Sequence, residues 1–469
     1  MMDANGIAVY TFGWDTAFGL PVPDANKTII DKKSSPKDFS YNDPQNYFKL
    51  SSTFGNWQIC NGGSGKNVRF SIPLSNVDLT YTRTGTKVSC DSGTAVMEVN
   101  MHYVPHTEAA ATDVKSNPFA LKVNPNSKTP VQPAAVLVSL ELSKDVGTVS
   151  QAIIEEGLKE WLNANLAEFD HIFSVVDLNR MIDKGQWGFV TPNYTSYAFL
   201  DNKDLASSVL GILTMTGNRT GEDLDEQISN SAIPAGSKAG FLVSQKRTMA
   251  DLVKPAIMQA YTGLTNKNFL LNDAGTTLYL TDHTSVDITP VVHDEDSYQP
   301  VLKQLQVESD GQILTLQSYT ETPIAPGITA QCWATNYYKI ELGKCKNGQT
   351  LKFVESQPGD VIHKIHQSEG SIITVLIIAI VAAVALLILT VVTEGAALVV
   401  GGLIIGLILG ADMILPDVIK AVNTDASPAI DLLLVNAVNP IKWTDSKDFK
   451  LDYASLNVSM QLGGDPLFI

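Results

Sequence analysis

One stretch of the chain, residues 372–411, limits the possible folds more than any other because it is almost wholly apolar. It reads IITVLIIAIVAAVALLILTVV, then Thr393-Glu394-Gly395, then AALVVGGLIIGLILGA, and Glu394 is its only ionisable residue. The first arm, residues 372–392, has 21 residues, and a helix of that length rises about 31 Å, close to the hydrocarbon thickness of a bilayer. The second arm, residues 396–411, has 16 residues and is short for a membrane span.

Small residues favour a helical hairpin with residues 393–395 at its tip. Gly402, Gly406 and Gly410 are four residues apart and form a stripe along which two helices can approach closely. The hairpin could enter a membrane, or the rest of the protein could enclose it, since a helix that is apolar on all sides has to be covered. A pair of buried strands is the third interpretation, because residues 372–381 are rich in β-branched side chains. The enclosed hairpin is favoured, because the flanking sequence has the pattern of a soluble protein.

The charge of the chain excludes some partners. The 469 residues, enough for two or three domains, carry a net charge of −16 and give a pI near 4.8. No basic stripe is visible, so the sequence argues against nucleic acid as a partner. Electrostatic attraction to anionic membranes is also disfavoured at neutral pH. Contact with a membrane would therefore depend on apolar surface or on acid conditions.

The N-terminus and the cysteines give little information about the cellular compartment of the protein. The first residues, MMDANGIAVYTFGWD, have neither the basic region nor the apolar core of a secretory signal. Cys60, Cys90, Cys332 and Cys345 form no CxxC pair, which predicts reduced thiols rather than a disulfide framework or a zinc site. The pairs Cys60–Cys90 and Cys332–Cys345 stay open if the protein is exported.

Hydrophobic periodicity predicts a β-rich α+β protein with antiparallel sheets. Residues 95, 97, 99, 101 and 103 alternate with polar positions, and residues 136, 138, 140 and 142 repeat this period of two. Residues 148–166 form the clearest amphipathic helix, with Val149 and Trp161 on its apolar face. Shorter helices are expected at 25–33 and at 251–260, where Pro255 would kink or shorten the helix. A last strand is expected over residues 449–462, with a bulge near Ala454-Ser455.

No motif for catalysis or metal binding stands out. The run Gly62-Gly63-Ser64-Gly65-Lys66 departs from a phosphate-binding loop and predicts a hairpin turn. The histidine pairs and acidic run with metal-like spacing are more typical of ordinary surface residues, and these are His102 and His106, His363 and His366, and Asp294-Glu295-Asp296. The sequence therefore predicts a protein that is not an enzyme and has no cofactor, although a bound lipid stays open.

Several short motifs, in order along most of the chain, resemble one known family. They include Gly13-Trp14-Asp15, Phe54-Gly55-Asn56-Trp57, Phe169-Asp170-His171-Ile172-Phe173, Ser196-Tyr197-Ala198 and Pro440-Ile441-Lys442-Trp443. The sequence is similar to the clostridial P-forty-seven proteins encoded in OrfX-type botulinum neurotoxin clusters and to their relatives in insecticidal toxin loci. That resemblance implies a tubular lipid-binding (TULIP) fold, in which long curved antiparallel sheets wrap around long helices. It divides the chain into a TULIP-like region at 1–265, with helix 148–166, and a second at 266–469, with the apolar hairpin.

The resemblance also implies a function. It indicates a non-enzymatic virulence component of a bacterial toxin system that binds acyl chains in an apolar groove, acts with proteins of its own gene cluster, and is secreted from the bacterial cytoplasm without a recognisable signal peptide. Two alternatives are a membrane-inserting toxin subunit and a chaperone-like partner of other cluster proteins. The expected lipid- or membrane-contacting residues are Ile377, Ile380, Leu387, Val391, Leu403 and Leu407, with Glu394 at the hairpin tip and Gly402, Gly406 and Gly410 packing the two helices.

Overall fold

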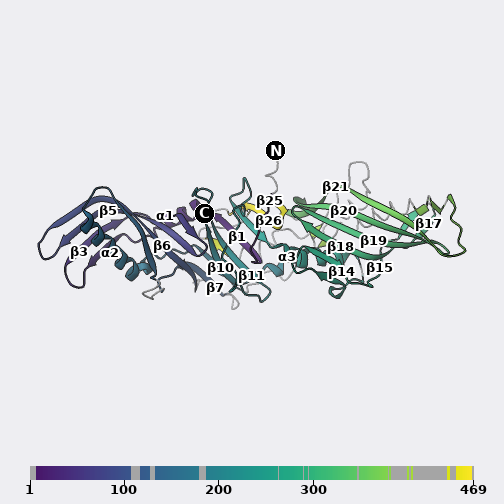
Figure 1. Cartoon of the computed structure of the whole chain (residues 1–469), viewed down its shortest axis with the longest axis horizontal. Helices are drawn as coiled ribbons and strands as arrows, with labels where there is room; N and C mark the ends of the chain where they lie inside the picture. Colours follow the sequence, from purple (N-terminus) through teal and green to yellow (C-terminus); the bar gives the residue numbers. More distant parts are fainter. Residues whose placement is uncertain are drawn as a thin grey trace.

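Three antiparallel sheets follow one another along the long axis of an elongated molecule (Figure 1). The computed structural model describes residues 7–106, 117–126, 133–178, 186–261, 263–288, 290–293, 295–345, 348–375, 377–378, 380–381, 399–400, 403–404, 441–443 and 450–466. Helices are few, and the sheets curl into half-barrels. The predicted β-rich antiparallel architecture is confirmed.

The nine-stranded sheet forms one end of the molecule, and helix α2 (Thr148–Asn165) packs against it. The sheet runs β2-β3-β5-β6-β7-β9-β24, with β4 beside β5 and β8 beside β6. Its strands are β2 (Asp38–Asn42), β3 (Phe48–Phe54), β4 (Gln58–Ser64), β5 (Asn67–Tyr81), β6 (Lys87–Pro105), β7 (Pro118–Val123), β8 (Ala135–Leu142), β9 (Ser174–Asp177) and β24 (Ile441–Trp443). The other helices on this part of the chain are α1 (Val22–Lys32), η1 (Leu166–Glu168) and η2 (Gln186–Val190).

The predicted amphipathic helix is confirmed as α2, which buries Ile154, Leu158 and Trp161. Val149 was expected on this apolar face, but its side chain is 70% exposed. On the helix surface Val149 lies in line with half-buried Ile153 and with exposed glutamates. It therefore faces away from the side that α2 buries.

Burial alternates along β6 as predicted, but it does not alternate along β8. Residues 95, 97, 99 and 101 of β6 are all buried. In β8, Val136 and Val138 are exposed. Val138 is the extra residue of a bulge, because Ser139 pairs with Val96 whereas Leu137 pairs with Met97.

The central six-stranded sheet collects strands from distant parts of the chain. Its order is β10 (Pro192–Leu200), β11 (Val209–Thr216), β1 (Thr16–Pro21), β12 (Ala239–Val243), β26 (Ser459–Asp465) and β25 (Lys450–Asn457). The prediction of one bulged strand over 449–462 is wrong, because the chain reverses at Val458, whose φ is +70°. The Val458 N–H donates to the Gly311 carbonyl at 2.8 Å, which helps to hold this uncommon conformation. The division of the chain at residues 265 and 266 stays a prediction.

The seven-stranded sheet forms the other end of the molecule (Figure 1). Its order is β13 (Phe269–Leu271), β14 (Thr277–Leu280), β18 (Val301–Asp310), β19 (Ile313–Ala325), β20 (Ile328–Cys345) and β21 (Gly348–Gln367), with β15 (Val286–Asp287) beside β18. A small ladder, β16 (Val291–His293) with β17 (Asp296–Tyr298), and the turn η4 (Asn266–Asn268) complete this region.

An irregular helix connects the central sheet to the seven-stranded sheet. It consists of α3 (Gln245–Thr248), a π-helical turn η3 (Met249–Val253) and α4 (Lys254–Ala260). The predicted disturbance by Pro255 is confirmed, since Pro255 stands in the first positions of α4, where a missing N–H matters least. Buried Leu252, Val253 and Ile257 face the hydrophobic core.

Among the residues that the structure describes, the apolar stretch begins with a helix, but these residues do not show the predicted hairpin of two helices. Residues 375, 377, 378, 380 and 381 are helical. In the second arm, β22 (Val399–Val400) pairs antiparallel with β23 (Leu403–Ile404), so the helix expected there is wrong at these four residues. The reason lies in the sequence, where β-branched side chains flank a Gly-Gly pair typical of a two-residue hairpin.

Candidate functional site

The apolar stretch leaves the seven-stranded sheet at the end farthest from the central sheet. The turn between β18 and β19 touches the central sheet, because the Gly311 carbonyl accepts from Val458. The opposite end of β19 leads to Gly327, whose carbonyl accepts a 2.9 Å hydrogen bond from the Ser368 N–H just after β21. Gly327 has a φ of +71°, and a side chain there would collide with the hydroxyls of Ser368 and Ser371. This turn therefore fixes where the apolar stretch begins.

A threonine begins the helix of the apolar stretch. The Thr374 hydroxyl accepts from the Ile377 N–H at 3.3 Å, and the Thr374 carbonyl accepts from the Ile378 N–H at 3.1 Å. The hydroxyl therefore satisfies a backbone donor that a helix otherwise leaves free at its start, and the carbonyl accepts the first regular helical hydrogen bond.

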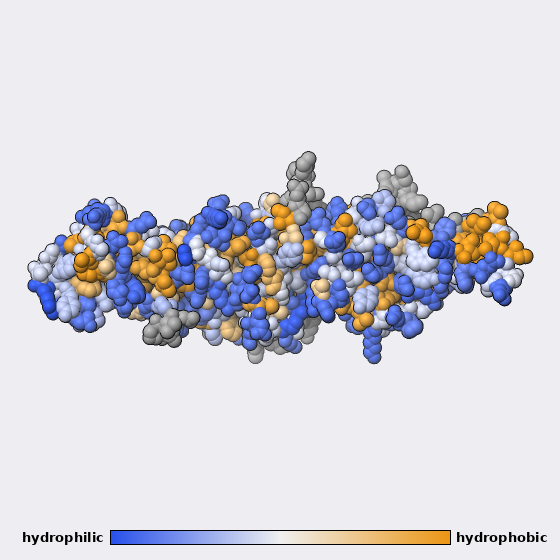
Figure 2. All heavy atoms as spheres, in the orientation of Figure 1, coloured by the Kyte–Doolittle hydropathy of each residue, from blue (hydrophilic) through white to orange (hydrophobic). Residues whose placement is uncertain are grey.

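This helix has a buried side and an exposed side. Val381 is fully buried, and Ile377 and Ile380 pack against the hydrophobic core. Large aliphatic side chains on the other side face solvent, and Figure 2 shows apolar surface gathered at this end of the molecule. These exposed side chains are Ile372 (76%), Ile373 (36%), Val375 (85%) and Ile378 (50%). We call residues 372–381 the apolar segment.

The described structure holds only part of the predicted contact set. Ile377 and Ile380 lie in the apolar segment, half-buried, and Leu403 lies in β23. Their predicted contact with lipid stays a prediction. The other predicted residues lie outside the described residues, and these are Leu387, Val391, Glu394, Gly402, Gly406, Leu407 and Gly410.

An aromatic pair stands on the outer face of the same sheet. The rings of Tyr319 on β19 and Trp333 on β20 stack with centroids 4.8 Å apart, and the Lys364 ammonium lies 5.5 Å from the Trp333 ring. The Tyr319 hydroxyl donates to the Glu321 carboxylate at 2.5 Å and accepts from Gln331 at 2.8 Å. Burial and Glu321 raise the pKa of Tyr319 to about 12, and the bond from Tyr319 holds the pKa of Glu321 below its usual range. Such cross-strand pairs stabilise the register of the strands.

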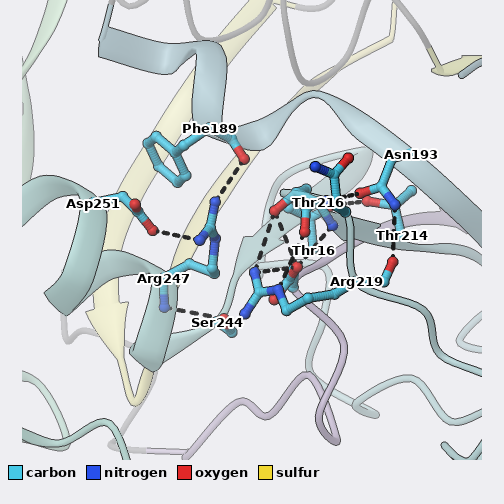
Figure 3. Close-up of polar contacts among 11 residues, drawn as sticks. Thr16, Phe189, Asn193, Thr214, Thr216, Arg219, Ser244, Arg247 and Asp251 are labelled. Carbon is cyan, nitrogen blue, oxygen red and sulfur yellow. Dashed lines mark hydrogen bonds and ion pairs between the residues drawn. The ribbon is translucent and has the colours of Figure 1, made fainter. Parts of the chain in front are cut away.

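A second polar cluster lies in the central sheet, and Asp15 is at its centre (Figure 3). Asp15 is buried, and one of its carboxylate oxygens accepts from the Thr216 N–H at 2.8 Å, the Thr216 hydroxyl at 3.0 Å and Arg219 at 2.5 Å. Sequence reasoning missed Arg219 and Thr216. The only signal was Asp15 itself, in the motif Gly13-Trp14-Asp15.

The irregular helix begins beside this cluster (Figure 3). Arg247 on α3 forms a 2.8 Å ion pair with Asp251 on the π-helical turn and donates to the Phe189 carbonyl at 2.9 Å. Burial lowers the pKa of Arg247 and raises the pKa of Asp251. A half-buried pair of this kind fixes a local geometry more than it adds stability. We interpret the cluster as a structural joint between the central sheet and the helix that enters the seven-stranded sheet.

The Gly62–Lys66 run closes the hairpin of β4 and β5, as predicted, with the turn at Gly65-Lys66, and it joins the nine-stranded sheet to the central sheet. Gly65 exchanges two backbone hydrogen bonds with Phe199 on β10, at 3.0 and 2.8 Å. The Tyr197 hydroxyl donates to the Lys66 carbonyl and accepts from the Met101 N–H, both at 2.7 Å. The Lys66 ammonium is paired with Glu226 at 2.6 Å. The run that resembled a phosphate loop is therefore engaged in structural contacts.

The described part of the chain contains no group of three or more His, Cys, Asp or Glu side chains placed to hold a metal ion. His102 and His106 lie at the end of β6, His363 and His366 lie on β21, and Asp294 lies outside the described residues. Cys60, Cys90 and Cys332 have free thiols, so neither proposed disulfide is formed. Among the residues that the structure describes, no helix combines the length and hydropathy needed to cross a bilayer.

The fold and the order of the motifs define a class of protein. A sequence profile of OrfX-like proteins, described as Protein OrfX2/OrfX3/P47, matches residues 11–464, and the chain belongs to this family. The resemblance expected from the sequence is confirmed. The family is that of the OrfX and P47 proteins of botulinum toxin gene clusters, so the chain is a toxin-cluster-associated protein.

Individual relatives support the assignment. Protein OrfX3 of Paraclostridium bifermentans is 34% identical over 484 residues, which cover 97% of this chain and 98% of that protein. Protein OrfX3 of Clostridium botulinum (strain Kyoto / Type A2) is 28% identical over 97% of this chain and 98% of its own length. The structure of P47 from Clostridium botulinum A2 superposes with a TM-score of 0.69 at 16% identity, covering 98% of both chains, and supports the fold.

Proposed function

We propose that this protein is a non-enzymatic component of a bacterial toxin system that binds lipid membranes through the apolar segment. The observation that carries the proposal is the exposure of Ile372, Val375 and Ile378 together at one end of the elongated molecule. Contiguous exposed apolar surface in a protein is typical of an interaction site. The net charge of −16 leaves apolar contact, rather than charge attraction, as the source of affinity.

Neighbouring residues support a membrane rather than another surface. Trp333 and Tyr319 lie on the outer face of the same sheet, with Lys364 beside them. Aromatic and lysine side chains are the ones that proteins place at the level of lipid headgroups. Aliphatic side chains at the tip, with aromatic residues set back from it, fit the change from hydrocarbon to headgroup.

The predictions of acyl-chain binding, of partners from the same gene cluster and of secretion belong to the same hypothesis. The curled sheets fit a TULIP-like fold that accepts acyl chains in an apolar groove, and the chain would act with other proteins of its cluster after secretion, against an insect or another host. A chaperone-like role would use the same exposed end to hold a partner polypeptide, and the experiment below separates that role from membrane binding.

Flotation with liposomes tests the proposal. The test variant carries Ile372→Asn, Val375→Asn and Ile378→Asn, and the matched control carries Val149→Asn, an exposed valine on α2 at the other end of the molecule. Burying each aliphatic side chain is worth about 1–2 kcal/mol, so losing all three should lower partitioning roughly 10²–10⁴-fold. The native protein and the control should float with the vesicles.

A native protein that stays at the bottom of the gradient would overturn the proposal. A test variant that floats as well as the native protein would contradict the role of the apolar segment. Retention of a cluster partner by a protein that does not float would favour the chaperone-like alternative.

A further inference from the structure

The last strand of the seven-stranded sheet has an open edge. β21 is the end strand of the sheet and pairs with β20, and no other strand that the structure describes pairs with it (Figure 1). Ile362 on the outer face of β21 is 64% exposed, and His363 on the inner face is also exposed. On the neighbouring strand, Cys332 lies opposite His363 and is only 1% exposed. Exposure therefore rises abruptly from β20 to β21, as it does at an uncovered edge.

Backbone groups on this edge point away from the sheet. The Ser368 N–H, directly after β21, donates to the Gly327 carbonyl directly before β20. Successive residues of a strand turn their N–H and C=O groups to opposite sides, and residues 360–367 pair with β20 without a register shift. The backbone groups of Val361, His363 and Ile365 therefore point outwards. An edge of this kind is a template for another strand.

The side chains on the outer face make this edge complementary to itself. Asp360, Ile362 and Lys364 stand at every second residue and are all exposed, so they share the outer face. If a second β21 lies antiparallel, with Ile362 opposite Ile362, each Asp360 lies opposite a Lys364. Opposite charges directly across two strands are stabilising, and like charges are destabilising. The charges therefore favour a second copy of this strand in that register.

The backbone fits the same register. With Ile362 at the centre, Val361 of each copy lies opposite His363 of the other, and both residues turn their N–H and C=O groups outwards, so each pair exchanges two hydrogen bonds. A shift by one residue would set an outward group against an inward one. The pairing with β20 shifts register between Gln357 and Asp360, around Pro358, so the regular edge is short. A contact of this size forms a weak dimer rather than an obligate one.

We propose that β21 is a dimerisation edge, which pairs with β21 of a second copy of this chain about a two-fold axis at Ile362. A two-fold axis uses the same surface on both molecules, so each favourable contact occurs twice. The occupant is a second copy because both the charges and the backbone groups of this edge are self-complementary. The two seven-stranded sheets then form one continuous sheet. This inference does not depend on the proposed membrane function, since residues 360–366 precede the apolar segment.

A cysteine at the axis tests the register. Ile362→Cys sets two thiols directly opposite each other in a non-hydrogen-bonded pair, where the Cα atoms lie about 4.5 Å apart, within the span of a disulfide. After mild oxidation the full-length variant should form a covalent dimer on a non-reducing gel, with the new disulfide located by peptide mass mapping. His366→Cys is the matched control on the same strand and face, because its opposite residue is Pro358. It should form far less covalent dimer.

Charge reversal tests the two ion pairs. Sedimentation equilibrium over a wide range of protein concentration measures the dissociation constant of the dimer. Asp360→Lys sets like charges opposite each other at both symmetric positions and should raise that constant about tenfold. Lys364→Asp should have a similar effect for the same reason. The double variant restores two pairs of opposite charge, so its dissociation constant should return close to the native value.

Three results would overturn the dimerisation edge. The first is a native protein that stays monomeric at every concentration. The second is a yield of covalent dimer from Ile362→Cys that is no higher than the yield from His366→Cys. The third is a double charge variant that dimerises as weakly as the two single variants, since the charges would then not face each other. All variants change exposed side chains, and circular dichroism checks that each one keeps the native fold.

Discussion

Replacing Asp15 by alanine should destabilise the central sheet more than most single substitutions. The substitution removes one carboxylate oxygen that accepts three hydrogen bonds, at 2.8, 3.0 and 2.5 Å. Two of the three donors belong to Thr216, which is fully buried, so its N–H and hydroxyl would remain without an acceptor. Each such orphan costs about 1–3 kcal/mol. Arg219 is partly exposed and can be hydrated, so its loss adds less.

The expected total is about 3–5 kcal/mol in the free energy of unfolding, in the range found when a buried ion pair is broken on one side. Urea unfolding followed by circular dichroism measures this difference from the shift in midpoint. Asp15→Asn keeps one acceptor oxygen and should cost clearly less than Asp15→Ala. Arg219→Met should cost least, because that side chain is 36% exposed.

A loss below about 1 kcal/mol for Asp15→Ala would refute this reasoning, since that is less than one orphaned buried donor should cost. Equal losses for Asp15→Asn and Asp15→Ala would show that the charge, and not the set of acceptors, stabilises the cluster.

Two further predictions concern single contacts. Gly63→Ala should lower the free energy of unfolding by about 2–4 kcal/mol. The reason is that a Cβ there would lie 2.4 Å from the Asn67 carbonyl oxygen and 2.8 Å from the Phe199 ring. Thermal unfolding measures this loss, and an unchanged midpoint would contradict the crowding. Glu321 has a lowered pKa, chiefly because Tyr319 donates to it, so its contribution is present above the usual range of a glutamate and is lost as the pH falls through the lowered value. Tyr319→Phe should therefore be less stable than the native protein at neutral pH and equally stable in acid, and a stability gap that is the same at both pH values would disprove the link.

Local patterns predicted much of the fold. The alternation from Ala95 to Met101 and the helical spacing around Trp161 both depend on one face meeting a core, and both are present in the structure. Val458 could not be predicted, because a valine at positive φ is imposed by contacts with a distant turn. A buried strand pair was only the third interpretation of the apolar stretch and was argued from residues 372–381, so the strands at 399–400 and 403–404 were not predicted. An apolar run with both β-branched residues and leucines fits a helix and a strand equally well.

The candidate site was harder to predict than the fold. The sequence indicated Ile377 and Ile380, but it placed no weight on Ile372 or Val375, whose exposure depends on which side of the helix meets the core. The partners of Asp15 are 201 and 204 residues away in the chain, and no local pattern connects them.

The order of strands in the central sheet has a consequence during synthesis. Strand β12, Ala239–Val243, is wholly buried and needs β26, Ser459–Asp465, as its neighbour. A ribosome adds about 5–20 residues per second, so the apolar edge of β12 waits on the order of 10–40 s for its partner. An uncovered edge of this kind invites pairing with other chains. A chain whose translation stops before β26 keeps that edge open to such pairing.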